Sequence, residues 1–185
     1  MTTCDHERAA CRPGLPAAPG RRTFIKLATL GAGVALLYGA APRLALAGHA
    51  KALMLSCMDY RLIDANVSFM REQGLDKEYD YVILAGASLG VVSDKFADWH
   101  ATFWQHLDVA IKLHAIEEVI VVDHRDCGAY RLALGADAVA TSEKELAAHV
   151  ATLTEFARQV RDKQPKLGLQ AFLMGLDGKA EPIKV

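Results

Sequence analysis

The stretch EVIVVDHRDCGAY, residues 118–130, decides the fold. Its apolar run, which ends at Asp123, is typical of a strand covered on both faces, as the strands of parallel sheets are. His124 and Cys127 follow that strand three residues apart, and Gly128 comes next. A histidine and a cysteine at a strand end are typical of one half of a metal or catalytic site, so further ligands should follow another strand.

Strands and helices alternate along the rest of the chain. Short apolar runs predict strands, and apolar residues at helical spacing predict helices. The predicted strands cover residues 51–56, 79–85, 118–123 and 169–174, and the predicted helices cover residues 62–72, 93–115 and 142–164. This order predicts an α/β fold, a three-layer sandwich around a mainly parallel sheet of four or more strands. In such sheets, ligand sites lie at the carboxyl ends of the strands.

Two local patterns add detail to this outline. Ser142 and Glu145 match a capping box and predict the start of the last helix. Residues 86–90 (GASLG) are expected to form a glycine-bearing loop. The backbone amides of such a loop could cradle an anion, but a tight turn between a strand and a helix explains the glycines equally well.

The first 47 residues have the character of an export signal. GRRTFIK at residues 20–26 precedes an apolar, Gly- and Ala-rich run over residues 27–41, and Ala45-Leu46-Ala47 matches a cleavage site. These features predict a twin-arginine signal peptide over residues 1–47, a mature domain over residues 48–185, and a periplasmic or secreted location. An uncleaved anchor is the alternative, although the run is shorter than the roughly 20 residues of a spanning helix.

The composition of the mature domain excludes some classes of partner. Residues 48–185 hold 15 Lys and Arg against 20 Asp and Glu, a formal net charge of −5. Such a domain lacks the clustered basic face of a nucleic-acid-binding protein, and no stable membrane span is expected after cleavage. Its two cysteines are Cys57 and Cys127. In an oxidising compartment these two could form one disulfide, which is the alternative to a role in a site.

The other half of the site follows the first predicted strand. That strand runs into SCMDYR, residues 56–61, so Cys57 stands at its carboxyl end. If the two strands are neighbours, Cys57, His124 and Cys127 converge at one edge of the sheet. Two cysteines and a histidine with one open position are a recurrent ligand set of catalytic zinc. Zinc bound there would lower the pKa of a coordinated water toward neutrality and so supply hydroxide.

Asp59 and Arg61 complete this constellation. A carboxylate two residues beyond a ligand can reach the metal or accept a hydrogen bond from the bound water. The Arg61 guanidinium can hold Asp59 in a bidentate fork and keep it ionised. Asp59 is therefore predicted both as a catalytic residue with Arg61 and as a fourth metal ligand. An ordinary surface ion pair, which contributes little, is the alternative.

With these residues the chain resembles the β-class carbonic anhydrases. The resemblance rests on Cys57-x-Asp59-x-Arg61 and on His124-x-x-Cys127-Gly128-Ala129, and it spans about residues 51–177. It implies Zn²⁺ on the two cysteines and the histidine, with Asp59 either closing the fourth position or pairing with Arg61. It also implies reversible hydration of carbon dioxide to bicarbonate and a homodimer or higher homo-oligomer.

Two positions depart from the family pattern. Ile83-Leu84-Ala85-Gly86 stands where Arg-Asn-Ala-Gly is usual, and Asp123 stands where glycine usually precedes the zinc histidine. The zinc assignment survives both changes, whereas the substrate remains open. Hydrolysis of carbonyl sulfide or carbon disulfide is one alternative, and a non-catalytic zinc-binding or thiol-switch module is another.

Several other residues have an ordinary reading beside a functional one. Asp123 and Asp126 could orient His124 or merely end a polar strand. The histidines on or near the long helix are expected to be solvated or at the edge of the core, with a proton shuttle as the alternative: His100, His106 and His114. Its aromatic residues are expected in the core or in a dimer interface: Trp99, Phe103 and Trp104.

Replacing Arg21 and Arg22 by lysine should trap the precursor in the cytoplasm, because the twin-arginine route reads both guanidinium groups. Immunoblots of cell fractions measure the precursor and the mature form. Arg43→Lys, which lies beyond the apolar run, is the matched control and should be exported normally. Undiminished mature protein in the periplasm of the double mutant would show that the signal is misassigned.

Overall fold

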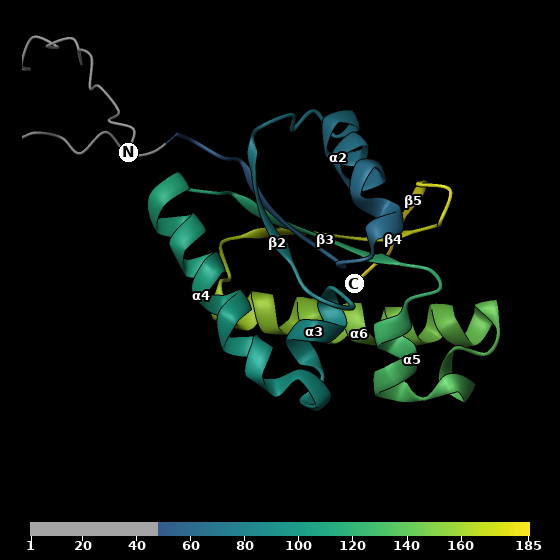
Figure 1. The fold of residues 1–185 in the computed structure, drawn as a ribbon. Coiled ribbons are helices and arrows are strands. Elements are labelled where there is room, and N and C mark those ends of the chain that lie inside the picture. The colour runs from purple at the N-terminus through teal and green to yellow at the C-terminus, as the bar shows by residue number, and fades with distance from the viewer. Residues whose placement is uncertain (1–47) are drawn as a thin grey trace, which may run out of the picture. The chain divides into compact units, whose positions relative to one another are not determined.

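The computed structural model describes residues 48–185, so the predicted signal peptide over residues 1–47 lies outside the described residues. The described chain folds around a five-stranded sheet with the strand order β2-β1-β3-β4-β5 (Figure 1). The strands are β1 (Ala52–Ser56), β2 (Tyr79–Ile83), β3 (Glu118–His124), β4 (Gly168–Met174) and β5 (Ala180–Pro182). β1 to β4 run parallel and β5 is antiparallel to β4, which confirms the predicted mainly parallel sheet.

Helices cover both faces of the sheet and give the predicted three layers (Figure 1). One face carries α2 (Ile63–Glu72). The opposite face carries α3 (Ser88–Val92), α4 (Ala97–His114), α5 (Gly128–Leu134) and α6 (Ser142–Lys163). Short 3-10 helices lie at Tyr60–Leu62, Asp94–Phe96 and Ala136–Val139. Within residues 48–185, the helices are all too short or too polar to cross a membrane.

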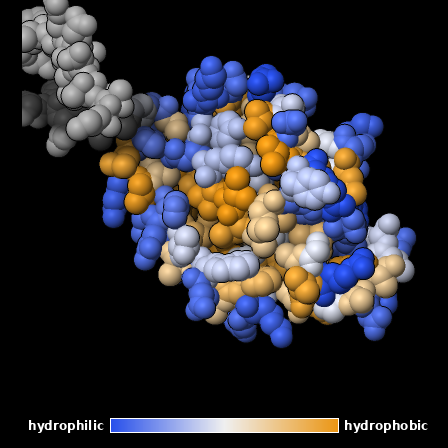
Figure 2. Space-filling model, viewed as in Figure 1, coloured by the Kyte–Doolittle hydropathy of each residue, from blue (hydrophilic) through white to orange (hydrophobic). Residues whose placement is uncertain are grey.

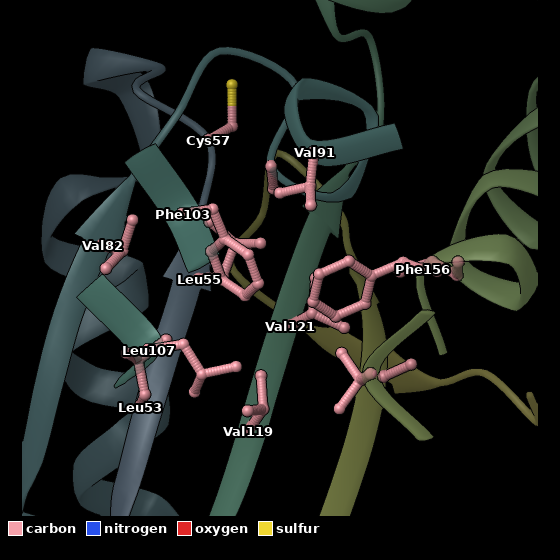
Figure 3. Close-up of a cluster of buried hydrophobic side chains, with 14 of the residues drawn as sticks. Leu53, Leu55, Cys57, Val82, Val91, Phe103, Leu107, Val119, Val121 and Phe156 are labelled. Carbon is pink, nitrogen blue, oxygen red and sulfur yellow. The ribbon is translucent and has the colours of Figure 1, made fainter. Parts of the chain in front are cut away.

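The central strands β1 and β3 carry the core because both of their faces are covered. Successive residues of β1 point to opposite sides of the sheet, and all of them are buried. Leu53 and Leu55 pack with Phe103 and Phe156, whose ring centroids lie 5.4 Å apart (Figure 3). Met54 packs in a second cluster on the α2 side. Burial on both faces explains the uninterrupted apolar runs, and it fixes the strand ends from which the site is built.

Strand β2 forms one edge of the sheet and is less covered. Tyr81 and Ile83 are exposed, and hydrophobic residues gather over this strand on the face shown in Figure 2. An apolar edge of this kind suits contact with another chain. The expected homodimer or higher homo-oligomer stays a prediction.

Two local expectations are wrong. The expected loop at residues 86–90 contains the start of α3, because Ser88 already begins a helical turn. Helix α6 is capped by Thr141, whose hydroxyl accepts a hydrogen bond from the Lys144 amide at 3.3 Å, so Ser142 is its first residue and not its cap. The carboxylate of Glu145 reaches the turn after β3 instead of completing a capping box.

Gly90→Ala should destabilise the protein by about 1–3 kcal/mol, since overpacking has costs of that size. A Cβ at Gly90 would lie 2.9 Å from the Ala85 carbonyl oxygen, which is backbone and has little room to move. Gly128→Ala is the control, because a Cβ there meets nothing within 4 Å. It should leave the free energy of unfolding unchanged or raise it by up to about 1 kcal/mol. Urea denaturation measures both, and a Gly90→Ala protein as stable as wild type would contradict the packing argument.

Candidate metal centre

Cys57, His124 and Cys127 come together at the carboxyl edge of the sheet. β1 and β3 are neighbours, with Ser56 in register with Val122, so Cys57 emerges beside the end of β3. Cys127 stands immediately before α5. One ligand atom from each of the three residues lies within 4.8 Å of the others, and all three residues are buried. The structure thus brings together the two cysteines and the histidine that the sequence places on separate strand ends.

The two cysteines form no disulfide in the described chain, and their surroundings differ. Their sulfur atoms lie 3.9 Å apart, and the Gly86 amide donates a hydrogen bond to Cys57 Sγ at 3.2 Å. The hydrogen bond from Cys127, supported by His124 and by the Gly86 amide, lowers the pKa of Cys57 although burial opposes this. The adjacent Cys57 and burial raise the pKa of Cys127. The Gly86 amide and the neighbouring groups therefore favour the thiolate form at Cys57 more than at Cys127.

His124 presents one nitrogen to the cluster. Its Nδ1 lies 2.8 Å from the Arg125 carbonyl oxygen, which can only accept, so Nδ1 carries the proton and, in the neutral ring, Nε2 offers a lone pair. Nε2 is buried without a hydrogen-bond partner among residues 48–185 and lies 3.9 Å from Asp59 Oδ2. Burial alone would lower the pKa of His124, but the neighbouring Cys57 raises it. A buried nitrogen without a partner is rare, and a metal ion would satisfy it.

Asp59 and Arg61 form the bidentate pair that the sequence predicts. Arg61 Nε donates to Asp59 Oδ1 at 2.9 Å and Nη2 donates to Oδ2 at 2.7 Å, while the Arg61 amide also donates to Oδ1. These bonds lower the pKa of Asp59 to about 2, and the same carboxylate raises the pKa of Arg61. The Asp59 side chain is 15% exposed, so this pair is more enclosed than an ordinary surface ion pair.

Asp126 is a second carboxylate partner of Arg61. Arg61 Nη1 donates to Asp126 Oδ2 at 2.9 Å, and Nη2 donates to the Asp126 carbonyl at 3.2 Å. Asp126 has a left-handed backbone with φ of 56°, and Glu145 of α6 accepts hydrogen bonds from its amide and from Arg125. Arg61 therefore connects the loop after β1 to the turn after β3. The carboxylate of Asp126 bonds to Arg61 and not to His124.

Asp123 does not turn toward the metal ligands. Its buried carboxylate bonds to Ser88, which lies in the stretch 86–90, and to Tyr130 and His149, for which the sequence predicts no role. No spacing pattern links them to Asp123. The loop amides considered for an anion cradle serve the protein's own groups, since Gly86 donates to Cys57 and Ser88 donates to Asp123.

A cavity of about 810 Å³ opens beside the cysteines. Both cysteines, Asp59 and Arg61 line it, together with apolar side chains from several elements: Met58, Tyr60, Phe96, Trp99 and Leu132. The Phe96 and Trp99 rings are stacked with centroids 4.4 Å apart. Trp99 therefore lines this cavity, a role that the sequence did not predict for it. Ala85, which matches the family pattern, lines the cavity, whereas Leu84 packs against the core and Ile83 is exposed.

The other aromatic residues and the histidines of α4 lie elsewhere. Phe103 is fully buried and Trp104 packs edge-on against it, as expected for the core. The three histidines bond to neighbouring groups: His100 to Ser93, His106 to Thr102 and His114 to Asp80. None of them lines the cavity beside Cys57 and Cys127. The structure favours the ordinary reading of these histidines.

Comparison with solved structures defines the class of fold. A carbonic anhydrase from Streptococcus mutans matches with a TM-score of 0.50 and 18% identity, over 87% of this chain and 97% of that chain. The wild-type β-carbonic anhydrase CafD of Aspergillus fumigatus matches with a TM-score of 0.51 and 12% identity, over 78% of this chain and 95% of that chain. At these identities the likeness shows the fold alone, which is that of β-carbonic anhydrases.

Sequence comparison gives the family. Residues 47–174 match the family described as "putative carbonic anhydrase", and this chain belongs to that family. An uncharacterised protein of Rickettsia conorii is 41% identical over 135 residues, which are 73% of this chain and 73% of the relative. An uncharacterised protein of Rickettsia bellii is 39% identical over 135 residues, which are 73% of this chain and 82% of the relative.

Proposed function

We propose that this protein is a zinc-dependent carbonic anhydrase that catalyses the reversible hydration of carbon dioxide to bicarbonate. The convergence of Cys57, His124 and Cys127 beside an apolar cavity carries the proposal. Membership of the carbonic anhydrase family supports it. An apolar pocket receives an uncharged linear molecule such as carbon dioxide more readily than it receives an ion.

The donor set of the cluster fits zinc. Two sulfurs and one imidazole nitrogen are ligands that Zn²⁺ prefers, and three protein ligands leave one position for chemistry. The unpartnered Nε2 of His124 and the thiolate of Cys57 are the donor atoms that such an ion requires. When bound, zinc would lower the pKa of a coordinated water and so supply a nucleophile near neutral pH.

The protein's own residues would orient this chemistry. The Arg125 carbonyl fixes the His124 ring, and the Gly86 amide stabilises the charge on Cys57. Asp59 is held by Arg61 with Oδ2 facing His124 Nε2, so its carboxylate can accept a hydrogen bond from the nucleophile and aim it into the cavity. In this position Asp59 is paired with Arg61, as in the open alternative that the resemblance implies.

Protein purified without chelator should contain about one zinc per chain, as measured by elemental analysis, because three suitable ligands converge. Cys127→Ser should lose most of this zinc. The zinc-loaded protein should accelerate carbon dioxide hydration in a stopped-flow indicator assay. Active, metal-free protein with a stoichiometric Cys57–Cys127 disulfide would contradict the proposal. Zinc-loaded protein that hydrolyses carbonyl sulfide but does not hydrate carbon dioxide would contradict the choice of substrate.

Asp59→Ala and Arg61→Ala should each lower the hydration rate. The double variant should be little slower than the slower of the two single variants, because the pair acts as a unit. Arg61→Ala should reduce the rate at least ~10-fold, which is about 1.4 kcal/mol of transition-state stabilisation. Zinc should stay bound in all three variants, since both cysteines and the histidine remain. Arg71→Ala, an exposed arginine paired with Asp76 next to α2, is the control and should keep the wild-type rate.

The role of Asp59 is the part of this mechanism that the same experiment can overturn. If Asp59 acted only as a fourth ligand that closes the resting site, its removal would free the metal. Asp59→Ala would then work at or above the wild-type rate near neutral pH with zinc still bound. That result would remove Asp59 from the orienting role and leave it as a gate.

A further inference from the structure

We propose that Asp123 is a positioning residue that fixes the ligand-bearing segments of the metal centre and slows the loss of zinc. Its carboxylate lies at the centre of a buried cluster, which we define as Asp123, Ser88, Tyr130 and His149. The inference rests on the proposed zinc site and adds residues that do not touch the metal. A glycine, usual at this position in the family pattern, could form none of the bonds described next.

The cluster joins four elements through one carboxylate. Asp123 Oδ1 accepts from the Ser88 amide at 3.1 Å. Oδ2 accepts from the Ser88 hydroxyl at 2.7 Å, from the Tyr130 hydroxyl at 2.5 Å and from His149 Nδ1 at 3.0 Å. All four side chains are buried, and they come from β3, α3, α5 and α6. A carboxylate can be buried at a tolerable free energy because donors occupy both of its oxygens.

Three residues of the cluster lie close in sequence to a candidate ligand or to a residue that bonds to one. Asp123 immediately precedes His124 in the chain. Ser88 lies two residues after Gly86, whose amide donates to Cys57 Sγ. Tyr130 lies three residues after Cys127, in the first turn of α5. Since the chain between these pairs is so short, fixing the cluster restrains the positions of all three ligands.

Asp123 acts through the backbone, since its side chain does not line the cavity. Neighbouring residues of a strand point to opposite faces, so Asp123 follows Val119 and Val121 into the core beneath α3 and α6, whereas His124 does not. None of the four cluster residues lines the cavity that opens beside Cys57 and Cys127 in the described chain. The cluster therefore has no direct route to substrate or metal.

His149 supports this assignment because it bonds to Asp123 while its second ring nitrogen stays without a hydrogen-bond partner in the part of the chain that the structure describes. Its Nδ1 carries the proton that Asp123 accepts, and its ring lies 3.9 Å from the Tyr130 ring, centroid to centroid. Its Nε2 is buried without a hydrogen-bond partner among residues 48–185. An unpaired polar atom in the interior is unfavourable. The bond to Asp123 is the interaction in the described chain that offsets this penalty.

The test compares zinc release from the full-length wild-type protein with release from two variants, Asp123→Asn and Tyr130→Phe. Asp123→Asn replaces an acceptor oxygen by a donor that faces other donors. Tyr130→Phe keeps the ring and removes the hydroxyl with its contacts to Asp123 and Ser88. A chromogenic chelator in excess measures the rate of release. Both variants should release zinc at least ~10-fold faster than wild type, the size of effect that residues supporting metal ligands have. The visible spectrum of the Co²⁺-substituted protein should also shift, because it reports the geometry of the ligands.

Met70→Ala is the control for general destabilisation. Met70 is fully buried in the hydrophobic cluster on the α2 side of the sheet, away from Asp123. It should lower the free energy of unfolding at least as much as Tyr130→Phe does. Its zinc release and Co²⁺ spectrum should nevertheless match wild type.

The possible failures are distinguishable. Wild-type protein that binds no zinc would overturn the proposed function and this inference with it. Wild-type protein that holds zinc, with Tyr130→Phe releasing it at the same rate and showing the same Co²⁺ spectrum, would overturn this inference alone. Equal acceleration by Met70→Ala would also overturn it, since the cluster would then act on stability and not on the ligands. Tyr130→Phe keeps the test decisive if Asp123→Asn does not fold.

Discussion

The parallel pairing of β1 with β3 is the constraint on which the rest of the structure depends. Leu55 pairs with Val121 and Ser56 with Val122, so both strands end at the same edge of the sheet and at nearly the same height. Cys57 and His124 meet there although 67 positions separate them in the sequence. The register is held because both faces of both strands are buried, and a slip by one residue would turn each apolar set to the wrong layer. The apolar core under Leu53, Leu55 and Val121 thus sets the distance between ligands.

Around this edge, the described charges have donors of their own. The Cys57 thiolate has the Gly86 amide, Asp59 has Arg61, and Asp126 shares the same guanidinium. Asp123, further inside, has Ser88, Tyr130 and His149. His124 Nε2 stands apart, buried and without a partner in the described chain. Among residues 48–185, His149 Nε2 is also unpartnered, but it lies away from the cysteines, whereas His124 Nε2 faces Cys57 and Cys127. An unpartnered lone pair next to two sulfurs is typical of a cation site.

The sequence predicts this site well at short range and poorly at long range. The apolar runs of β1 and β3 reveal strands that end in Cys57 and His124, and the spacing of Asp59 and Arg61 predicts their pairing. The partners of Asp123 are 35, 7 and 26 residues away, so they are brought together by packing and not by any local pattern. Helix α5 has seven residues and β5 has three, too few for an apolar period to show. The cap of α6 was misplaced by one residue because Ser142 and Thr141 are both good caps, and the carboxylate that would decide between them, Glu145, bonds to the turn after β3.

Neither departure from the family pattern places a changed side chain in the lining of the cavity. At the end of β2, Leu84 joins the core and Ile83 is exposed, whereas Ala85, which matches the family pattern, lines the cavity. Asp123 points into the same core and reaches α3, α5 and α6 without lining the cavity. A residue that holds ligands through the backbone is free of the constraints that substrate imposes on the cavity wall. Selectivity for substrate and retention of metal can therefore change independently in this fold, one through residues such as Ala85 and Trp99 and the other through the cluster beneath His124.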